Sequence, residues 1–478
     1  MLSPLFTDFY QLTMMSGYFD AGKYQQAAVF ELFFRKIPQQ GGYCVAAGLE
    51  QALDYLENLH FTPEEIDYLR GLKLFNEAFL DSLHNFRFQG QVWALPEGTV
   101  VFPHQPLLRV CAPLPQAQLV ESALLNILNF QTLIATKTAR ITCAAGPQSQ
   151  VLEFGMRRAQ GPDGAMSASR AAFVGGATAT SNALAGMRYH IPVRGTQAHS
   201  WIMSFASELE AFRAYAGRYP DTALLLVDTY DTLQSGVPNA IQVARELAAE
   251  GHRLAGIRLD SGDLAELSIA ARAMLDEAGF PDVRIVASND LDEFLIESLR
   301  NQGARIDTWG VGTQLVTSKH EPALGGVYKL VSIEESGAWR DCIKISSNPS
   351  KVTNPGTKQV YRAVQQGQFV GDLLALASEP APRSGDLLWD SLYQSPPRPL
   401  EAERFEPLLE KVMDDGRRLA PAPSLSQIQQ RTHQQLACLP PGCLRLQNPA
   451  LYAYGLTQQL HDLRSRLLLE HSRPRTPA

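Results

Sequence analysis

Short apolar runs alternate with amphipathic stretches of helical length between residues 150 and 311, and this alternation constrains the fold most. The apolar runs are 150–154, 191–194, 223–227, 254–259, 283–287 and 306–311. The helical stretches are 200–215, 238–250, 262–278 and 291–301. Strands that alternate with helices are typical of βα units and a parallel sheet. Roughly five or six such units in succession fit a β/α barrel, including an incomplete one.

The segments on both sides of this central region contain both strand-like and helix-like apolar patterns. The first 135 residues combine strand-like alternation with a long apolar-striped stretch at 119–139, which predicts a helix. A strand-rich segment begins near residue 325, and the pattern from 401 to 478 predicts a helical C-terminal region. The chain of 478 residues is too long for one core, so several domains are expected.

Composition narrows the class of protein. The chain is 45% apolar and 19% charged, with a net charge of −7, which is typical of a soluble globular protein. Acids and bases are interspersed, so neither a nucleic-acid groove nor a membrane surface is expected. No zinc-binding spacing is present. The six cysteines are scattered along the chain, so we expect their thiols to be reduced and the protein to be cytoplasmic.

Every apolar run of the central region is followed by polar or small residues. In chain order these are Glu153, Arg157, Thr196, His199, Asp228, Asp231, Arg258, Asp260, Ser261, Asp263, Ser288, Asn289, Asp290, Gly310, Gly312 and Thr313. Parallel α/β proteins place their active sites at the carboxyl ends of the strands. We therefore expect these side chains to converge on one face.

His199 and Arg258 are the two side chains of this set with the most direct chemistry. A histidine can carry a proton or a phosphoryl group near neutral pH. Arg258 lies two residues before Asp260 and hence on the same face of its strand. Its guanidinium can hold a carboxylate or a phosphate, although a buried Arg–Asp pair that supports a barrel layer explains the pattern equally well.

Asp260 and Asp263 stand beside the start of a predicted helix. One of two such carboxylates is expected to serve only as a helix cap. The other can bind a ribose diol or a magnesium ion that carries phosphates.

Glycine-rich turns offer candidate anion sites. Gly310, Gly312 and Thr313 follow a strand, where backbone N–H groups and a hydroxyl can cradle a phosphate, although glycine at such a turn is more often geometric. Residues 175–178 form a second turn of small residues. Neither Gly-x-Gly-x-x-Gly after a strand nor a P-loop motif occurs, so the cleft suits a phosphorylated sugar rather than hydride transfer.

At these residues the chain resembles the nicotinate phosphoribosyltransferase family. The matching segments are 7–11 (Thr-Asp-Phe-Tyr-Gln), 153–164, 195–200 (Gly-Thr-Gln-Ala-His-Ser), 258–264 (Arg-Leu-Asp-Ser-Gly-Asp-Leu), 310–313 (Gly-Val-Gly-Thr) and 325–330 (Gly-Gly-Val-Tyr-Lys-Leu). The resemblance implies that nicotinate and phosphoribosyl pyrophosphate yield nicotinate mononucleotide and pyrophosphate, the first step of NAD salvage from nicotinic acid. It also implies coupled ATP hydrolysis through a phosphohistidine, with Mg²⁺ as cofactor.

The resemblance assigns roles to individual residues. His199 would carry the phosphoryl group, and Phe154 and Tyr10 would stack on the pyridine ring. Tyr10 would reach the neighbouring subunit's site, because these enzymes are homodimers with shared active sites. The remaining implied substrate residues are Arg157, Thr196, Arg258, Asp260, Asp263, Gly310, Gly312 and Thr313. Of these, Arg258 and Asp260 join His199 as expected catalytic residues, and magnesium is expected to bind mainly through pyrophosphate, with Asp260 as a further ligand.

The implied fold is α/β, an irregular, incomplete β/α barrel at 136–324. An N-terminal α/β open sandwich at 1–135 would be completed by about 325–400, with the helical C-terminal region after it.

Two alternatives stay open. Nicotinamide-using relatives carry an acidic residue after the glycine turn, whereas residues 175–180 contain none, which favours an anionic substrate. A catalytically silent scaffold of the same fold is disfavoured because His199, Asp260 and Asp263 are all present.

Overall fold

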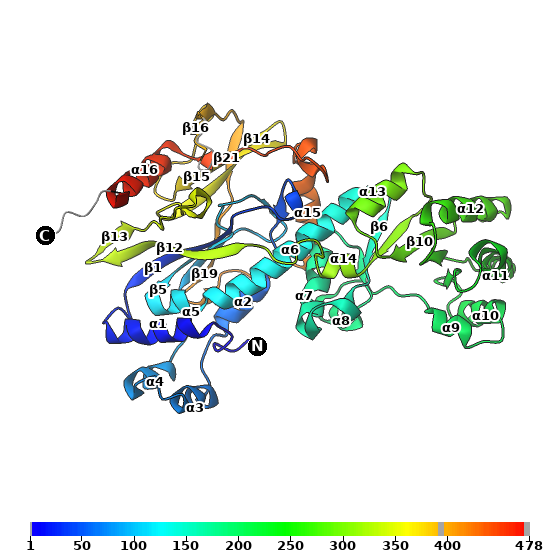
Figure 1. Ribbon diagram of the computed structural model, residues 1–478, viewed down its shortest axis with the longest axis horizontal. Coiled ribbons are helices and arrows are strands. Elements are labelled where there is room, and N and C mark those ends of the chain that lie inside the picture. The colour runs from blue at the N-terminus through cyan, green and yellow to red at the C-terminus, as the bar shows by residue number, and fades with distance from the viewer. Residues whose placement is uncertain (1, 391–395, 473–478) are drawn as a thin grey trace. The chain divides into compact units, whose positions relative to one another are not determined.

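The computed structural model describes residues 2–390 and 396–472 (Figure 1). The chain divides into two compact units. Unit 1 comprises Met1–Leu133 and Ala323–Ala478, and unit 2 comprises Ile134–Pro322.

A six-stranded parallel sheet forms the centre of unit 2. Its strands are β6 (Gln150–Glu153), β7 (Ala179–Thr180), β8 (Leu224–Leu226), β9 (Gly256–Leu259), β10 (Arg284–Asn289) and β11 (Thr308–Val311). Their order across the sheet is β7-β6-β11-β10-β9-β8. The predicted α/β class with a parallel sheet is thereby confirmed.

Helices connect these strands. They are α7 (Gly161–Val174), α8 (Ala183–Tyr189), α9 (His199–Met203), α10 (Glu208–Arg218), α11 (Val237–Ala249), α12 (Leu264–Glu277), α13 (Glu293–Asn301) and α14 (Thr313–Val316), with a 3-10 turn at Met156–Arg158 and a π-helix at Thr232–Gly236. Figure 1 shows α12 and α13 beside strand β10.

Backbone register aligns the carboxyl ends of the central strands. Val286 of β10 pairs with Arg258 of β9 and with Thr308 of β11. Two rungs further along, Ser288 pairs with Gly310. The residues that follow these strands therefore meet at one edge of the sheet.

The sheet is open in the part of the chain that the structure describes, where no ladder joins β7 to β8. The predicted strand at 191–194 is wrong, because only one parallel bridge, between Thr180 and Val193, forms there. Pro192 lacks an N–H group and cannot extend a ladder on both sides. The segment continues to Gln197, whose amide nitrogen lies 3.4 Å from the carbonyl of Leu224 on β8.

The single helix predicted for 200–215 is two helices, α9 and α10. The Ser207 hydroxyl accepts a hydrogen bond from the Glu210 backbone N–H and so caps the start of α10. The Ser-x-x-Glu pattern at 207–210 is a helix-start signal that the apolar spacing obscured.

Unit 1 contains two larger sheets and most of the remaining helices. The seven-stranded sheet has the order β13-β12-β1-β5-β3-β19-β20, and the four-stranded sheet has the order β18-β14-β15-β21. The strands are β1 (Ala27–Phe34), β2 (Cys44–Val45), β3 (Gln91–Ala94), β4 (Val100–Val101), β5 (Leu108–Pro113), β12 (Gly326–Glu335), β13 (Ala338–Asp341), β14 (Lys358–Gln365), β15 (Gln368–Leu376), β16 (Leu387–Leu388), β17 (Arg398–Pro399), β18 (Arg404–Pro407), β19 (Glu410–Asp414), β20 (Arg417–Arg418) and β21 (Tyr454–Leu456).

The helices of unit 1 lie at both ends of the chain. They are α1 (Phe9–Asp20), α2 (Leu49–Glu57), α3 (Pro63–Gly71), α4 (Glu77–Leu83), α5 (Leu114–Leu119), α15 (Leu425–Ala437) and α16 (Gln458–Ser472). The helix predicted at 119–139 is α6 (Glu121–Ala145), within which the boundary between the two units falls.

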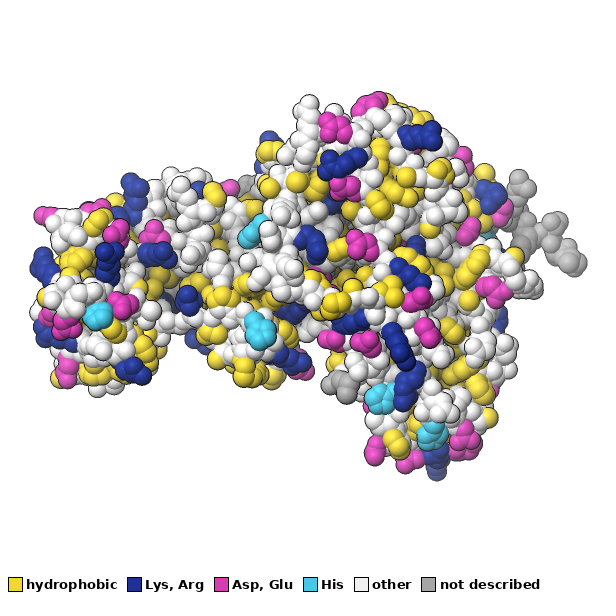
Figure 2. All heavy atoms as spheres, turned by 180° about the vertical axis from the view of Figure 1, so that it is seen from behind, with side chains coloured by type: hydrophobic (Ala, Val, Ile, Leu, Met, Phe, Trp, Pro, Cys, Tyr) yellow, Lys and Arg dark blue, Asp and Glu magenta, His cyan; other side chains and the backbone are white. Residues whose placement is uncertain are grey.

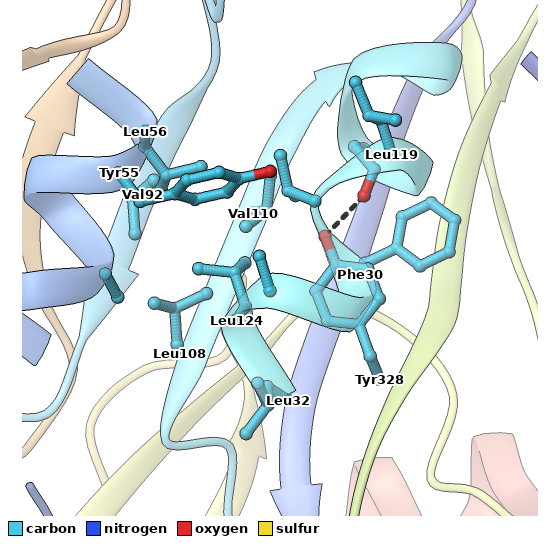
Figure 3. Packing of buried hydrophobic residues seen from close by; sticks show 14 of the residues in the cluster. Phe30, Leu32, Tyr55, Leu56, Val92, Leu108, Val110, Leu119, Leu124 and Tyr328 are labelled. Carbon is cyan, nitrogen blue, oxygen red and sulfur yellow. Dashed lines mark hydrogen bonds between the residues drawn. The ribbon is translucent and has the colours of Figure 1, made fainter. Parts of the chain in front are cut away.

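Sequence-distant segments share the core of unit 1 (Figure 3). Strand β12 pairs antiparallel with β1, and the rings of Phe30 and Tyr328 stack with centroids 4.9 Å apart. The buried Tyr328 hydroxyl donates a 2.7 Å hydrogen bond to the Ala117 carbonyl, drawn as a dashed line in Figure 3. Burial of this large ring is therefore combined with a satisfied polar group.

The C-terminal region predicted as helical also contains strands. Strand β18 pairs with β14, β19 with β3, and β21 with β15. Such short strands depend on partners far away in the sequence, which local periodicity does not reveal.

Positive and negative side chains are interspersed over the face drawn in Figure 2. None of the described helices is both long enough and apolar enough to cross a membrane.

A buried carboxylate joins α6 to α13 within unit 2. Lys137 Nζ lies 2.5 Å and Arg140 Nε 3.1 Å from the carboxylate of Glu293, and all three side chains are buried. We predict that Glu293→Gln lowers the free energy of unfolding by about 3 kcal/mol, because it leaves buried cations without their anion. Urea denaturation measures the loss.

The exposed pair Arg213–Glu246 provides the control. Glu246→Gln should cost less than about 1 kcal/mol, since exposed pairs contribute little. Equal losses for the two variants would contradict the stabilising role of Glu293.

Candidate functional site

Arg258, on β9, is the centre of the site. Its Nε donates to Ser288 Oγ (2.7 Å), one terminal nitrogen donates to Thr196 Oγ1 (2.9 Å), and the other donates to Asp260 Oδ1 (2.7 Å). A guanidinium has five N–H donors. These three bonds leave one N–H on each terminal nitrogen without a partner among the described residues.

Ser288 and Asp260 close a ring of hydrogen bonds with Arg258. The Ser288 hydroxyl donates a short hydrogen bond to the same Asp260 oxygen that Arg258 contacts. Burial alone would raise the pKa of Asp260, but the Ser288 hydrogen bond and the Arg258 charge outweigh it and lower that pKa. Asp260 is therefore an anion at neutral pH.

Asp228 connects Asp260 to His199. One Asp228 oxygen accepts hydrogen bonds from the Asp260 backbone N–H (2.9 Å) and the Ser261 hydroxyl (2.6 Å). The other lies 3.3 Å from His199 Nε2. The Asp228 side chain is 1% exposed and that of His199 is 41% exposed, so a buried carboxylate orients a solvent-accessible imidazole.

Asp228 and Ser288 were expected at strand ends, but the sequence assigned neither of them a role. The sequence signal for these roles was their position, since Asp228 comes two residues after β8 and Ser288 is the second-last residue of β10. Which oxygen each side chain contacts depends on inter-strand register, which a single sequence does not contain.

Phe154 forms one wall of the site, and Gly310 makes room for it. A Cβ atom at Gly310 would lie 2.7 Å from the Phe154 ring, which is closer than real Cβ contacts allow. The Arg258 guanidinium carbon lies 5.9 Å from the centroid of that ring. Glycine at position 310 therefore serves the close approach of an aromatic side chain, in addition to lining the cavity beyond it.

Two adjoining cavities lie at this edge of the sheet. The first measures about 290 Å³ and its lining includes Phe154, Arg157, Thr196, His199, Arg258 and Asp260. The second measures about 420 Å³, and its lining shares Phe154, Arg157, Arg258 and Asp260 and adds Gly310, Gly312 and Thr313. Nine of the predicted site residues are thus brought together.

The second cavity also has cationic and strained residues at its wall. Arg158 donates a 3.3 Å hydrogen bond to the Thr313 hydroxyl, and Lys319 lies nearby in the lining. Asn289 has a backbone φ of 136°, a conformation that L side chains rarely adopt. Such strain is concentrated at functional sites.

Two predicted site residues lie outside this cluster. Asp263 caps α12, because its carboxylate accepts from the N–H groups of Ala265 and Glu266 (both 3.0 Å). Tyr10 belongs to unit 1, where it lies on α1 with 49% of its surface exposed.

The prediction that the glycine turn at residues 175–178 forms a second anion cradle is wrong. Its four backbone N–H groups all donate within the fold, to Ala171, Phe173, Ala172 and Val151. The turn ends α7, and a Cβ at Gly175 would lie 2.3 Å from the Ala135 carbonyl oxygen. Close packing against α6 explains the glycine there.

Groups of three or more metal-ligating side chains suited to a cation do not occur among the described residues. Asp260 Oδ2 accepts no hydrogen bond from them, while Oδ1 is occupied by Arg258 and Ser288. The donor set therefore fits a divalent cation that is held mainly by oxygens of a bound ligand.

Family models of nicotinate phosphoribosyltransferase match nearly the whole chain. Residues 5–129 match the nicotinate phosphoribosyltransferase N-terminal domain, residues 149–374 the nicotinate phosphoribosyltransferase family, and residues 357–464 the C-terminal domain.

Individual proteins and a solved structure are similar to the chain over nearly its full length. The chain is 46% identical over 476 residues to a nicotinate phosphoribosyltransferase of Bacillus subtilis, covering 97% of this chain and 96% of that protein. It is 37% identical to one of Caenorhabditis elegans, covering 99% and 94% of the two chains. The crystal structure of human nicotinic acid phosphoribosyltransferase superposes with a TM-score of 0.83 at 33% identity, covering 96% and 99%. The chain belongs to the nicotinate phosphoribosyltransferase family.

Proposed function

We propose that the protein transfers the phosphoribosyl group of phosphoribosyl pyrophosphate to nicotinate and releases pyrophosphate, coupled to ATP hydrolysis through His199. The product, nicotinate mononucleotide, begins NAD salvage from nicotinic acid, a reaction that we place in the cytoplasm. The observation that carries the proposal is the immobilised Arg258, with one N–H free on each terminal nitrogen beside the Phe154 ring. Family membership supports the same reaction.

The first cavity suits the pyridine carboxylate. Phe154 offers an aromatic face, and Arg157 and Arg258 both line the cavity. Asp260 is the lining carboxylate, and it is already paired with Arg258. An anionic ring substrate is therefore favoured over a neutral amide.

The second cavity suits the phosphoribosyl group. Gly310, Gly312 and Thr313 would hold the 5′-phosphate, with Arg158 and Lys319 supplying positive charge. Asp260 would face the ribose, where its anionic charge stabilises the oxocarbenium-like transition state as the bond to pyrophosphate breaks. Asp260 Oδ2 would be a protein ligand of a magnesium ion bound mainly through pyrophosphate oxygens, which would supply neutralisation of the leaving group's charge.

His199 is oriented for phosphoryl transfer at Nδ1. Asp228 Oδ1 lies 3.3 Å from Nε2 and, as a carboxylate, favours the tautomer with the proton on Nε2, which would leave the lone pair on Nδ1. Nδ1 would attack the γ-phosphorus of ATP, ADP would leave, and water would later cleave the phosphoramidate to release phosphate. The Asp228 carboxylate stabilises the positive charge that the ring acquires.

Product formation by the purified protein tests the proposal. With phosphoribosyl pyrophosphate and Mg²⁺, nicotinate should yield nicotinate mononucleotide, and ATP should stimulate the rate. Preference for nicotinamide, or no product from either base, would contradict it. His199→Ala should abolish ATP stimulation, whereas His252→Ala, which removes the comparable exposed pair with Asp221, should not.

We predict that Asp228→Asn slows phosphoenzyme formation by about 100-fold, because the neutral amide cannot stabilise the imidazolium. Rapid-quench measurement of phosphate bound to the protein gives this rate. A rate equal to that of the unsubstituted protein would mean that Asp228 does not assist the histidine.

A homodimer with shared sites is part of the proposal. Unit 1 exposes Phe6, Phe9 and Tyr10, and unit 2 exposes Met156 and Met187. Contiguous exposed apolar residues are typical of surfaces that meet another protein, and Phe6, Phe9 and Tyr10 lie within five residues of one another. The proposed occupant is a second copy, whose Tyr10 would complete the pyridine site.

Mixing two inactive variants tests this sharing. Tyr10→Ala and His199→Ala each damage a different part of a site, so a hybrid dimer contains one intact site. After exchange of subunits, the mixture should recover about one quarter of the ATP-stimulated activity, as random pairing gives. Activity equal to the mean of the two parents would place Tyr10 in its own chain's site.

A further inference from the structure

We propose that Ser288 is a positioning residue that fixes Arg258 in the orientation that recognises a pyridine carboxylate, and so sets the preference for carboxylate over carboxamide. The inference rests on the proposed function. It concerns a residue that touches the arginine rather than the substrate ring.

Backbone register holds the Ser288 hydroxyl in place. Ser288 is the fifth residue of β10, pairs with Gly310 on one side, and is 4% exposed. On the other side, the register that pairs Ala287 with Leu259 brings Ser288 level with Asp260. A strand residue in the middle of a parallel sheet has little freedom to move, so its hydroxyl is a fixed reference point.

The Ser288 hydroxyl uses both of its hydrogen-bonding functions inside the site. It accepts from Arg258 Nε (2.7 Å) and donates to Asp260 Oδ1, the oxygen that also accepts from a terminal nitrogen of Arg258. Thr196 holds the other terminal nitrogen at 2.9 Å. With all three nitrogens anchored, the guanidinium plane cannot turn about its long axis without breaking hydrogen bonds.

This orientation decides which ligand the two remaining N–H groups accept. A carboxylate offers an acceptor oxygen to each of them. A carboxamide offers one acceptor and an NH₂ group, which would meet the second N–H donor to donor. Discrimination between carboxylate and carboxamide therefore requires that Arg258 keep its orientation. Loss of the hydrogen bond at Nε should weaken this discrimination.

The test compares four variants in the full-length protein. Ser288→Ala removes the hydroxyl, Ser288→Cys replaces it with a poor acceptor of similar size, and Ser288→Thr keeps it. Ser268→Ala is the matched control, since Ser268 is a fully buried serine of α12 whose hydroxyl donates to Ala265 and accepts from Arg305. The readouts are the KM for nicotinate and the inhibition constant of nicotinamide against nicotinate.

We expect Ser288→Ala and Ser288→Cys to raise the nicotinate KM about tenfold, and to change the nicotinamide inhibition constant by less than about threefold. Ser288→Thr and Ser268→Ala should keep the ratio of the two constants. If the Ser288→Ala protein does not fold, the ratio measured for Ser288→Cys tests the proposal.

A ratio unchanged in the folded Ser288→Cys or Ser288→Ala protein would overturn the proposal, even where turnover falls, because a purely structural role affects both ligands alike. Failure of the unsubstituted protein to form nicotinate mononucleotide would instead overturn the proposed function, so the two failures are distinguishable.

Discussion

The site depends on the immobilisation of one guanidinium. Arg258 is held at all three nitrogens by side chains from three different segments: Thr196, Asp260 and Ser288. A cation fixed in this way keeps its charge and its direction without a cost of reorganisation when a ligand arrives. The alternative reading of Arg258 and Asp260, as a buried pair that only supports the sheet, does not fit, because both line the two cavities.

A continuous chain of hydrogen bonds joins this guanidinium to the histidine. It runs from His199 to Asp228, from Asp228 to the backbone of Asp260, and from the Asp260 carboxylate to Arg258. A change of charge at the imidazole therefore acts on Asp228 and, through it, on the loop that carries Asp260. If His199 is phosphorylated as proposed, this path connects the added charge to the residues that are proposed to bind the substrate.

Sequence periodicity predicted the parallel sheet and the edge where polar residues gather, because period and strand-end chemistry are local properties. Periodicity did not predict the elements whose formation depends on long-range contacts. The 191–194 segment makes one bridge instead of a strand, and β18, β19 and β21 exist only through distant partners. The roles of Asp228 and Ser288 were missed for the same reason, since both follow from inter-strand register. Asp263 showed the ambiguity of carboxylates at helix starts, because its capping role was foreseeable but could not be assigned to one aspartate of the pair.

A crystal structure with bound nicotinate mononucleotide tests the account most directly. We predict that the carboxylate lies within hydrogen-bonding distance of both terminal nitrogens of Arg258, with the pyridine ring against Phe154. We also predict that the 5′-phosphate lies at Gly310, Gly312 and Thr313. A carboxylate bound by Arg157 alone, with Arg258 still engaged only with Thr196, Asp260 and Ser288, would contradict the central role given to Arg258.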